Sequence, residues 1–309
     1  MKLKRKIGWL LLIATLTTTT NVEAKKGDQS GKVKSIIFLI GDGMGLAHVT
    51  MSMVEQGYAT TIFDEADNIA MQKSYSANNR VTDSAASGTA LATGYKTNNG
   101  MIGMTPDGEH RESIAALAAK RGMSCGVVAT SSIQHATPAS FYAHVESRKS
   151  YNEIAQQLAT STLSVAIGGG NKFMKQDVDG VNLIDKMRDG GFTVVTTMDE
   201  LRSADCDKLL GIFAEDGLKS IPAGRDTTYL ATATAKALEV LSKDKDGFFL
   251  MVEGSQIDWA SHANNSKRIM HEMYDFERAI KVAVDFARQH EDVLVVVSAD
   301  HETGGLSLV

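Results

Sequence analysis

Four short apolar runs in this chain each lead into acidic or histidine residues, and this pattern limits the fold more than any other feature. The last run, Val293–Val297, precedes Asp300 and His301. The other three are Ile36–Ile40 before Asp42, Val127–Ala129 before the segment around His135, and Phe248–Val252 before Glu253. Runs rich in Val, Ile, Leu and Phe that alternate with helical stretches are typical of a parallel sheet covered on both faces.

The ends of these runs also predict where a site lies. Ligands of such sheets bind outside the carboxyl ends of the strands, so the acids and histidines are expected at one edge. A cluster of this composition is typical of a metal-ion site. The chain has 309 residues, 43% of them apolar, with no internal repeat or linker. We therefore predict an α/β fold, a three-layer αβα sandwich with a central, mostly parallel sheet.

The N-terminus has the pattern of a secretory signal peptide. A basic start, Lys2–Lys6, is followed by a short apolar run, Ile7–Leu16, and by the small-residue signal Val22–Ala24. We predict that residues 1–24 are a signal peptide, that residues 25–309 form one catalytic domain, and that the protein is exported to the periplasm or the extracellular space. An N-terminal membrane anchor is the alternative. No later segment is apolar enough to span a membrane.

Charge and cysteine content exclude some partners and leave one question open. The net charge is -5, and no Lys/Arg cluster with interleaved aromatics follows the N-terminus, so we expect no nucleic-acid-binding surface. Export permits disulfides, and the chain has two cysteines. Cys125 falls in a predicted strand and Cys206 in a polar loop. The sequence does not say whether they pair.

Three further element predictions bear on the structure described below. We expect a strand at Ala70–Ser76, a helix over His110–Arg121 that ends at Gly122, and a loop from 131 through Pro138.

An Asp and a His lie four residues apart after one of the apolar runs. On a helical turn, Asp258 and His262 would share one face, and a carboxylate with an imidazole suits zinc. Glu253, at the end of the run, is a hard oxygen ligand that suits magnesium or zinc. In isolation, such an Asp–His pair is more often a surface pair.

The segment Thr82–Ala90 holds a candidate nucleophile. Ser84 falls at a predicted helix N-terminus, where backbone N–H groups favour an anion. Its small neighbours keep the approach open. A plain helix cap is the alternative. No histidine has a spacing that makes it a base for Ser84, so a bound metal would have to activate the hydroxyl.

A third segment runs from Gln134 to Arg148. Thr137 offers a hydroxyl, His135 an imidazole, and Arg148 a bidentate fork for phosphate. His144 fits a structural role better than that of a ligand.

Taken together, these motifs resemble the alkaline phosphatase family. They occur in family order and span residues 36–309. The motifs are Gly41-Asp42-Gly43-Met44-Gly45, Thr82-Asp83-Ser84-Ala85-Ala86-Ser87, His135-Ala136-Thr137-Pro138 with Arg148, Glu253 through His262, and Ala299-Asp300-His301.

The resemblance implies a phosphomonoester hydrolase with two Zn²⁺ and one Mg²⁺, small phosphomonoester substrates and a homodimer. Ser84 would be the nucleophile and would pass through a phosphoserine, while Arg148, oriented by Asp83, would clamp two phosphate oxygens. The implied metal ligands are Asp42, Asp300 and His301 for the zinc that activates Ser84, Asp258 and His262 for the other zinc, and Asp42, Thr137 and Glu253 for magnesium.

The chain departs from the best-known bacterial pattern at two positions. His135 stands where that pattern has Asp, and Trp259 stands where it has Lys, although other branches of the family carry His at the first position. We expect His135 to act through water, behind the ligands, and magnesium to bind more weakly or to be replaced by zinc. Trp259 brings no charge to the phosphate, but its indole N–H can still donate a hydrogen bond.

A third departure concerns the second zinc. Alkaline phosphatases take a further zinc-ligating histidine from well beyond the Asp-His motif, and none of the eight histidines here sits in that context. We expect a fragment that lacks the C-terminal part and leaves this zinc one ligand short.

The residues also leave other functions open. A related sulfatase, phosphomutase or phosphodiesterase could use the same metal edge, and a non-catalytic phosphate- or metal-binding protein is the alternative from another class. Ser84, between Asp83 and Ala85, favours the phosphatase, because a sulfatase needs Cys or a modified Ser in its own motif.

Overall fold

The computed structural model describes residues 33–178 and 180–308. The predicted signal peptide, 1–24, and the polar residues 25–32 lie outside the described residues.

A seven-stranded sheet forms the centre of the fold, and all its pairings are parallel. The strand order is β6-β7-β3-β2-β8-β1-β9. The strands are β1 (Ser35–Gly41), β2 (Ser124–Ser132), β3 (Val165–Gly169), β6 (Thr193–Val195), β7 (Leu209–Ile212), β8 (Phe248–Gly254) and β9 (Val293–Ala299). A separate antiparallel ribbon joins β4 (Asp177–Val178) to β5 (Val181–Asn182). The predicted α/β class is confirmed.

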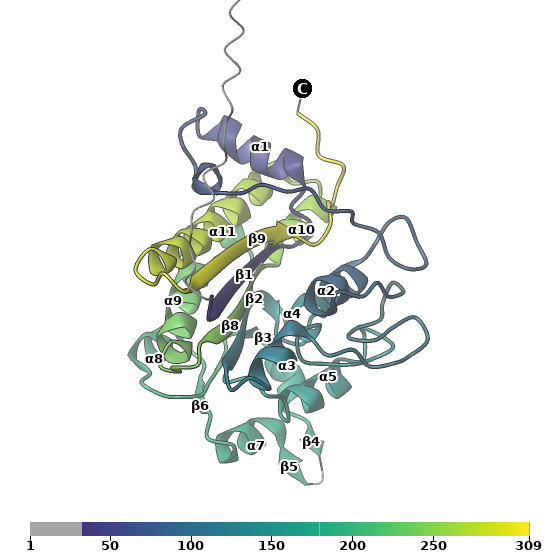
Figure 1. Ribbon diagram of the computed structural model, residues 1–309, viewed down its shortest axis with the longest axis vertical. Coiled ribbons are helices and arrows are strands. Elements are labelled where there is room, and N and C mark those ends of the chain that lie inside the picture. Colours follow the sequence, from purple (N-terminus) through teal and green to yellow (C-terminus); the bar gives the residue numbers. More distant parts are fainter. Residues whose placement is uncertain (1–32, 179, 309) are drawn as a thin grey trace, which may run out of the picture. The chain divides into compact units, whose positions relative to one another are not determined.

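Helices cover both faces of this sheet. Figure 1 shows α9 and α11 on one side and α2, α3 and α5 on the other. The α-helices are α1 (Leu46–Glu55), α2 (Ser84–Thr93), α3 (Ile114–Ala119), α4 (Ala136–Ala139), α5 (Tyr151–Leu158), α6 (Asn171–Met174), α7 (Leu183–Asp189), α8 (Met198–Ser203), α9 (Tyr229–Leu241), α10 (Gln256–His262) and α11 (Ser266–Ala287). Two 3₁₀ turns, η1 (Ile62–Glu65) and η2 (Ile221–Ala223), complete the set. The three predicted layers are present.

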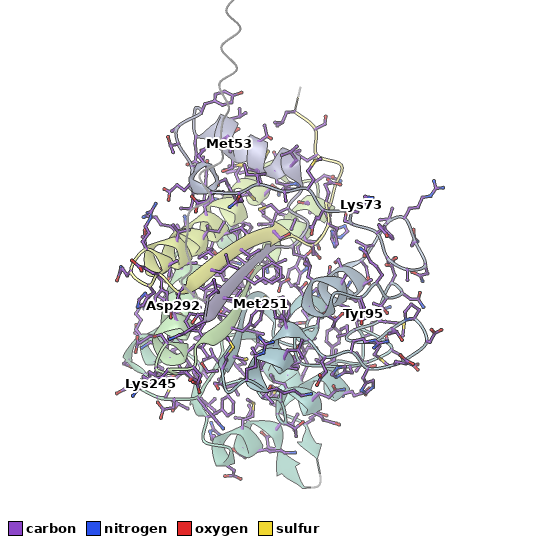
Figure 2. All side chains as sticks on the ribbon, in the orientation of Figure 1. Met53, Lys73, Tyr95, Lys245, Met251 and Asp292 are labelled. Atoms are coloured by element: carbon purple, nitrogen blue, oxygen red, sulfur yellow. The ribbon has the colours of Figure 1, made fainter. Side chains whose placement is uncertain are left out.

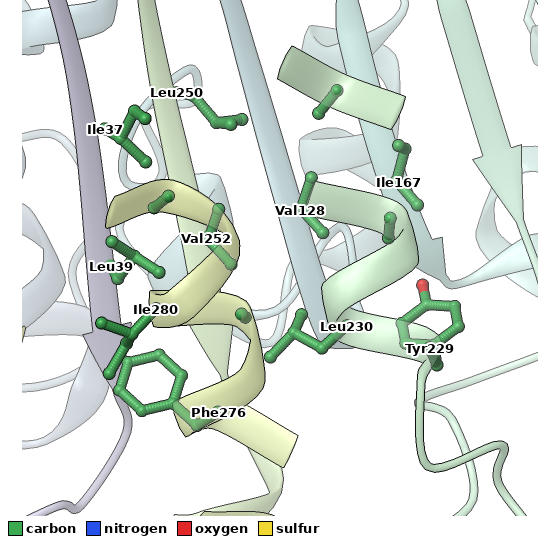
Figure 3. Close-up of a cluster of buried hydrophobic side chains, with 14 of the residues drawn as sticks. Ile37, Leu39, Val128, Ile167, Tyr229, Leu230, Leu250, Val252, Phe276 and Ile280 are labelled. Atoms are coloured by element: carbon green, nitrogen blue, oxygen red, sulfur yellow. The ribbon is translucent and has the colours of Figure 1, made fainter. Parts of the chain in front are cut away.

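Alternate residues of the central strands fill the two cores. Ile37 and Leu39 of β1 pack with Phe276 of α11 on one face, as Figure 3 shows. Ile40 and Met251 belong to the core on the other face. Figure 2 shows Met251 within the layers and Lys73 and Tyr95 on surface segments. Each large side chain buried in this way stabilises the fold by roughly 1.5–3 kcal/mol.

Three element predictions were wrong. Ala70–Ser76 forms no strand, and only Ser76 of this segment is buried, so it has no apolar face to hold against the sheet. The helix expected from His110 begins only at Ile114, because Ser113 caps it through a bond from the Ala116 N–H. The loop expected through Pro138 contains β2 residues up to Ser132 and the single-turn helix α4.

The cysteines do not pair. Both thiols are free, and Cys125 is buried as expected for a strand residue. Within the described part of the chain, no helix is long and apolar enough to cross a membrane.

The strand β9 lies at one end of the sheet. Among the described residues it pairs only with β1, and Leu294, Val296 and Val297 are partly exposed. This strand matters for the site, since its last residue, Ala299, precedes Asp300 and His301.

A buried ionic cluster fixes the segment between β7 and α9 to α11. Arg225 donates to Asp275 Oδ2 at 2.9 Å and also to Glu272, and all three side chains are buried. Glu272 accepts a further bond from the Ile221 N–H at 2.9 Å. Burial raises the pKa of Asp275 to about 6, and the Arg225 guanidinium opposes that rise.

Arg225→Ala should therefore destabilise the protein strongly. The change leaves the buried Glu272 without its cation and Asp275 with only the more exposed Arg278, 3.4 Å away, and breaking a buried pair typically costs about 3–5 kcal/mol. Chemical denaturation measures the loss. Arg202→Ala is the matched control, because its partners Asp199 and Asp226 are exposed and such pairs contribute at most about 1 kcal/mol. Equal losses in the two variants would contradict the assigned role of the cluster.

Candidate functional site

The carboxyl ends of three adjacent strands bring the predicted acids together. In the register of β1, Ile40 lies opposite Glu253 of β8, and Gly41 lies opposite Ala299 of β9. Asp42 and Asp300 therefore follow their strands at the same level. Asp42, Glu253 and Asp300 are all buried.

A first group of possible ligands consists of Asp42, Asp300 and His301. Their ligand atoms all lie within 4.8 Å of one another. His301 Nε2 is 3.2 Å from Asp300 Oδ2 and 3.7 Å from Asp42 Oδ1. Asp300 is held in place by the Gly43 N–H at 3.0 Å on Oδ1 and by the Ser87 hydroxyl at 3.0 Å on Oδ2.

A second group shares Asp42 and adds His135 and Glu253, again with ligand atoms within 4.8 Å. Several of its polar atoms are buried without a hydrogen-bond partner, namely both carboxylate oxygens of Asp42, Glu253 Oε1, His135 Nδ1 and the hydroxyl of the neighbouring Thr137. Buried polar atoms are normally satisfied. This set of mostly oxygen donors fits a divalent cation.

His135 thus belongs to the second group of possible ligands. From the sequence we expected it to lie behind the ligands and to act through water. Trp259 packs edge-on against it, with ring centroids 5.6 Å apart and planes at 75°. Trp259 therefore packs against the imidazole of His135.

The protonation of these groups reflects their burial. Burial, together with the nearby Asp300, Asp258 and Glu253, raises the pKa of Asp42 well above its ordinary value. Burial raises the pKa of Glu253 to about 7 and lowers that of His135 to about 3. Without a cation, the charged forms of these carboxylates are unfavourable, and a bound cation would reverse that preference.

Ser84 lies beside the first group. It is the first residue of α2, and its N-cap Asp83 accepts a bond from the Ala86 N–H at 3.0 Å. The Ser84 hydroxyl is 3.3 Å from His301 Nε2 and is almost fully buried. Asp83 therefore caps α2, and the Ser84 side chain does not.

Asp83 also orients Arg148. The Arg148 guanidinium donates to Asp83 Oδ2 at 3.1 Å, and the Gly100 N–H donates to the same oxygen at 3.0 Å. The Arg148 N–H donates in turn to the Gly100 carbonyl at 2.7 Å. The backbone and the side chain of Arg148 are thus both fixed near the start of α2.

Asp258 and His262 share one face of α10, as their spacing predicts. His262 Nε2 is 3.4 Å from Asp258 Oδ1, and the His262 side chain is 71% exposed. Thr303 donates to Asp258 Oδ1 at 2.6 Å. Over residues 33–178 and 180–308, no third His, Cys, Asp or Glu completes a metal-holding group with this pair.

Sequence reasoning missed three side chains that support the site. Thr303 bonds Asp258, Ser131 donates to Glu253 Oε2 at 3.2 Å, and Ser87 bonds Asp300. Only Ser87 carried a signal, because it follows Ser84 by nearly one helical turn. The alternative structural role of His144 agrees with its stacking on the His110 ring, 4.6 Å between centroids.

Comparison with known proteins gives one consistent answer. The family described as "Alkaline phosphatase" matches residues 33–309. The chain is 39% identical to alkaline phosphatase 4 and 40% identical to alkaline phosphatase 3 of Bacillus subtilis (strain 168), over 96% and 93% of its length. It spans 67% and 64% of those two relatives, or about two thirds of their length.

Solved structures agree. The alkaline phosphatase of the Antarctic bacterium TAB5 superposes with a TM-score of 0.83 at 39% identity, covering 89% of this chain and 80% of that one. A variant of the TAB5 enzyme with a histidine replaced by aspartate, described with Mg bound in its M3 site, has a TM-score of 0.84 at 38% identity and covers 90% of this chain and 80% of that one.

The raised pKa of Glu253 predicts how the metal-free protein responds to pH. Its folded pKa is about 7, above the ordinary 4.5. The contribution of this carboxyl to stability is therefore fully present below about pH 4.5 and is lost as the pH rises through about 7. Glu253→Gln cannot ionise. In the presence of a chelator, the melting temperature of this variant minus that of the wild type should therefore increase by several degrees between about pH 5 and pH 8.

Glu112→Gln is the control for this comparison, because Glu112 is exposed and pairs with Lys120 on the surface. Its melting temperature should follow the wild type at every pH. Identical pH profiles for the wild type and Glu253→Gln would contradict the prediction.

Proposed function

The chain belongs to the alkaline phosphatase family, and on that premise we propose that it hydrolyses phosphate monoesters with Ser84 as the nucleophile. The observation that carries the proposal is the 3.3 Å approach of the Ser84 hydroxyl to His301, a member of a buried group of possible metal ligands. Small phosphomonoesters are the proposed substrates.

The fit of the donor atoms supports two cation positions, and we propose a third at the Asp258–His262 pair. Asp42, Asp300 and His301 would hold one zinc, and Asp258 with His262 would contribute to the other. Asp42, Thr137 and Glu253 would hold magnesium, with His135 near enough to join them. When bound, these cations supply positive charge that lowers the pKa of a hydroxyl or water and stabilises charge on phosphoryl oxygens.

The residues of the chain would do the remaining work. The Ser84 hydroxyl loses its proton, and its oxygen forms a bond to phosphorus as the bond to the leaving oxygen breaks. This gives a phosphoserine, and the leaving alkoxide takes up a proton from water and departs as the alcohol. Water then attacks the same phosphorus, the bond to the Ser84 oxygen breaks, and phosphate leaves. Arg148, held by Asp83, would donate to phosphate oxygens, and the backbone N–H groups at the start of α2 favour the same anion.

A second candidate is a non-catalytic protein that binds phosphate or metal. The incomplete Asp258–His262 pair favours it, because a catalytic zinc normally has three protein ligands. Both candidates predict metal binding, and only the first predicts turnover.

Ser84→Ala should abolish hydrolysis of p-nitrophenyl phosphate in the presence of zinc and magnesium, a loss of about 10³-fold or more. The variant should still bind metal, because Ser84 is not needed to hold the cations. Ser87→Ala is the matched comparison on the same helix. It removes a bond to Asp300 but leaves the nucleophile, so we expect only a partial loss. Activity unaffected by Ser84→Ala would exclude the covalent route, and an inactive wild type would favour the binding protein.

His135→Asp should tighten magnesium binding. Aspartate replaces a neutral imidazole with a hard, charged oxygen ligand, and the TAB5 variant with the same kind of replacement is described with Mg bound. We expect an affinity gain of about tenfold, measured by magnesium retention after dialysis. His290→Asp, on an exposed residue, should leave retention at the wild-type level. Tight stoichiometric magnesium in the wild type would count against the weak site that we propose.

We propose that residues 1–24 direct export and are removed. Mass spectrometry of protein from the periplasm or the medium should then find a chain that begins at Lys25. An uncut chain in the membrane fraction would instead support the N-terminal anchor. Sedimentation of the same material tests the proposed homodimer.

A further inference from the structure

A buried histidine outside the proposed ligand sets joins two parts of the site. His48 is the third residue of α1 and is fully buried. Its Nδ1 is 3.1 Å from the Gly45 backbone nitrogen, and its Nε2 is 2.8 Å from the Ser261 hydroxyl, 213 residues along the chain. Ser261, itself buried, precedes His262 on α10.

The bonding pattern fixes the tautomer of His48. The Gly45 N–H can only donate, so Nδ1 must accept and carry no proton. The Ser261 hydroxyl donates its hydrogen to the Ile257 carbonyl at 2.7 Å, so its oxygen must accept from Nε2–H. The two ends of the ring independently require the same neutral form. Burial also lowers the pKa of His48, which favours that form.

This bond joins segments that carry different ligands. The loop before α1 contains Asp42, and its Gly43 N–H also holds Asp300 at 3.0 Å. The other end of the bond is on α10. Ser261 lies next to His262, and Ile257, which accepts from Ser261, lies next to Asp258. Among the described residues, one hydrogen bond joins His48 to α10, and it reaches Ser261, which lies between Asp258 and His262 in the sequence.

A second route between the same segments passes through Thr303. Its N–H donates to the Gly43 carbonyl at 3.1 Å, and its hydroxyl donates to Asp258. This route fixes the Asp258 carboxylate by a hydrogen bond, whereas at the His262 end of α10 the same segment only packs, through Gly304, against the Ser261 backbone. The His48–Ser261 bond is the side-chain hydrogen bond that ties the His262 end of α10 to the helix that follows the Asp42 loop.

We propose that His48 is a positioning residue, which sets the separation between the Asp42–Asp300–His301 group and the Asp258–His262 pair by holding α10 through Ser261. The proposal rests on the proposed function in taking that pair as a zinc position. It assigns to His48 no contact with metal or substrate.

Two conservative variants separate this role from a merely structural one. The terminal amide of Asn stands where Nδ1 stands, so His48→Asn can still accept the Gly45 N–H but cannot reach Ser261. The amide of Gln stands where Nε2 stands, so His48→Gln can still donate to Ser261 but loses the bond to Gly45. A helix-capping role predicts that Asn is the better substitute, whereas the positioning role predicts Gln.

The measurement is a Zn²⁺ titration of the full chain against a chromophoric chelator. The binding event lost in His262→Ala is assigned to the Asp258–His262 pair, and the event lost in Asp300→Ala to the other group. His48→Asn and Ser261→Ala should each weaken the His262-dependent event about tenfold or more, as is typical for partners behind a metal ligand. Neither should change the Asp300-dependent event more than about twofold, and the double variant should resemble either single one.

Ser52→Ala is the matched control. Ser52 is a buried serine on α1 that bonds Glu277 of α11 instead of α10, so both zinc events should stay at wild-type affinity. The proposal is overturned if His48→Asn binds zinc as the wild type does, if His48→Gln loses as much as His48→Asn, or if both events weaken together.

Hydrogen exchange keeps this test separate from that of the proposed function. If the wild type shows no His262-dependent zinc event, the two-zinc part of the proposed function fails. The His48 link is then decided in chelator by amide exchange of α10. Faster exchange in His48→Asn and Ser261→Ala, but not in His48→Gln, supports the link, and unchanged exchange in all three overturns it.

Discussion

The fold of this chain is arranged around buried negative charge. Asp42, Glu253 and Asp300 lie at one edge of a parallel sheet, and the oxygens of Asp42 have no hydrogen-bond partner. Transfer of an unpaired carboxylate from water to a protein interior is costly, so such a group is either neutral or matched by a cation. The surrounding elements hold these acids close together, which makes a cation the natural match.

The loop after β1 contacts several other segments of the site. Gly43 has φ of +69°, and a Cβ there would lie 2.8 Å from Thr303 Oγ1 and 3.0 Å from the Asp258 backbone. Only glycine permits this approach. Because the loop binds Asp300 and the Thr303 backbone at once, it fixes the segment after β9, with its ligand Asp300, against Asp42. His48 bonds Gly45 of the same loop and Ser261 of α10, and so links the two.

The sequence predicted the strand ends well, because a short apolar run followed by an acid has a local signature. Glu253 and Asp300 were located in this way, and the spacing of Asp258 and His262 placed them correctly on one helical face. The bond between His48 and Ser261 left no such signature. It joins residues 213 apart through two side chains that look ordinary in their own segments. The strand prediction for Ala70–Ser76 failed because only Ser76 of this segment is buried, which leaves no apolar face to pack against the sheet.

The edge position of β9 has a consequence for how the site and the fold depend on each other. Asp300 leaves β9, and Asp42 leaves β1, the strand that holds β9 in place. A cation shared by these two carboxylates would link β1 to β9 at one edge of the sheet that the described residues form. Thermodynamic linkage then requires that the affinity for the cation and the stability of the β1–β9 pairing against local unfolding increase or decrease together.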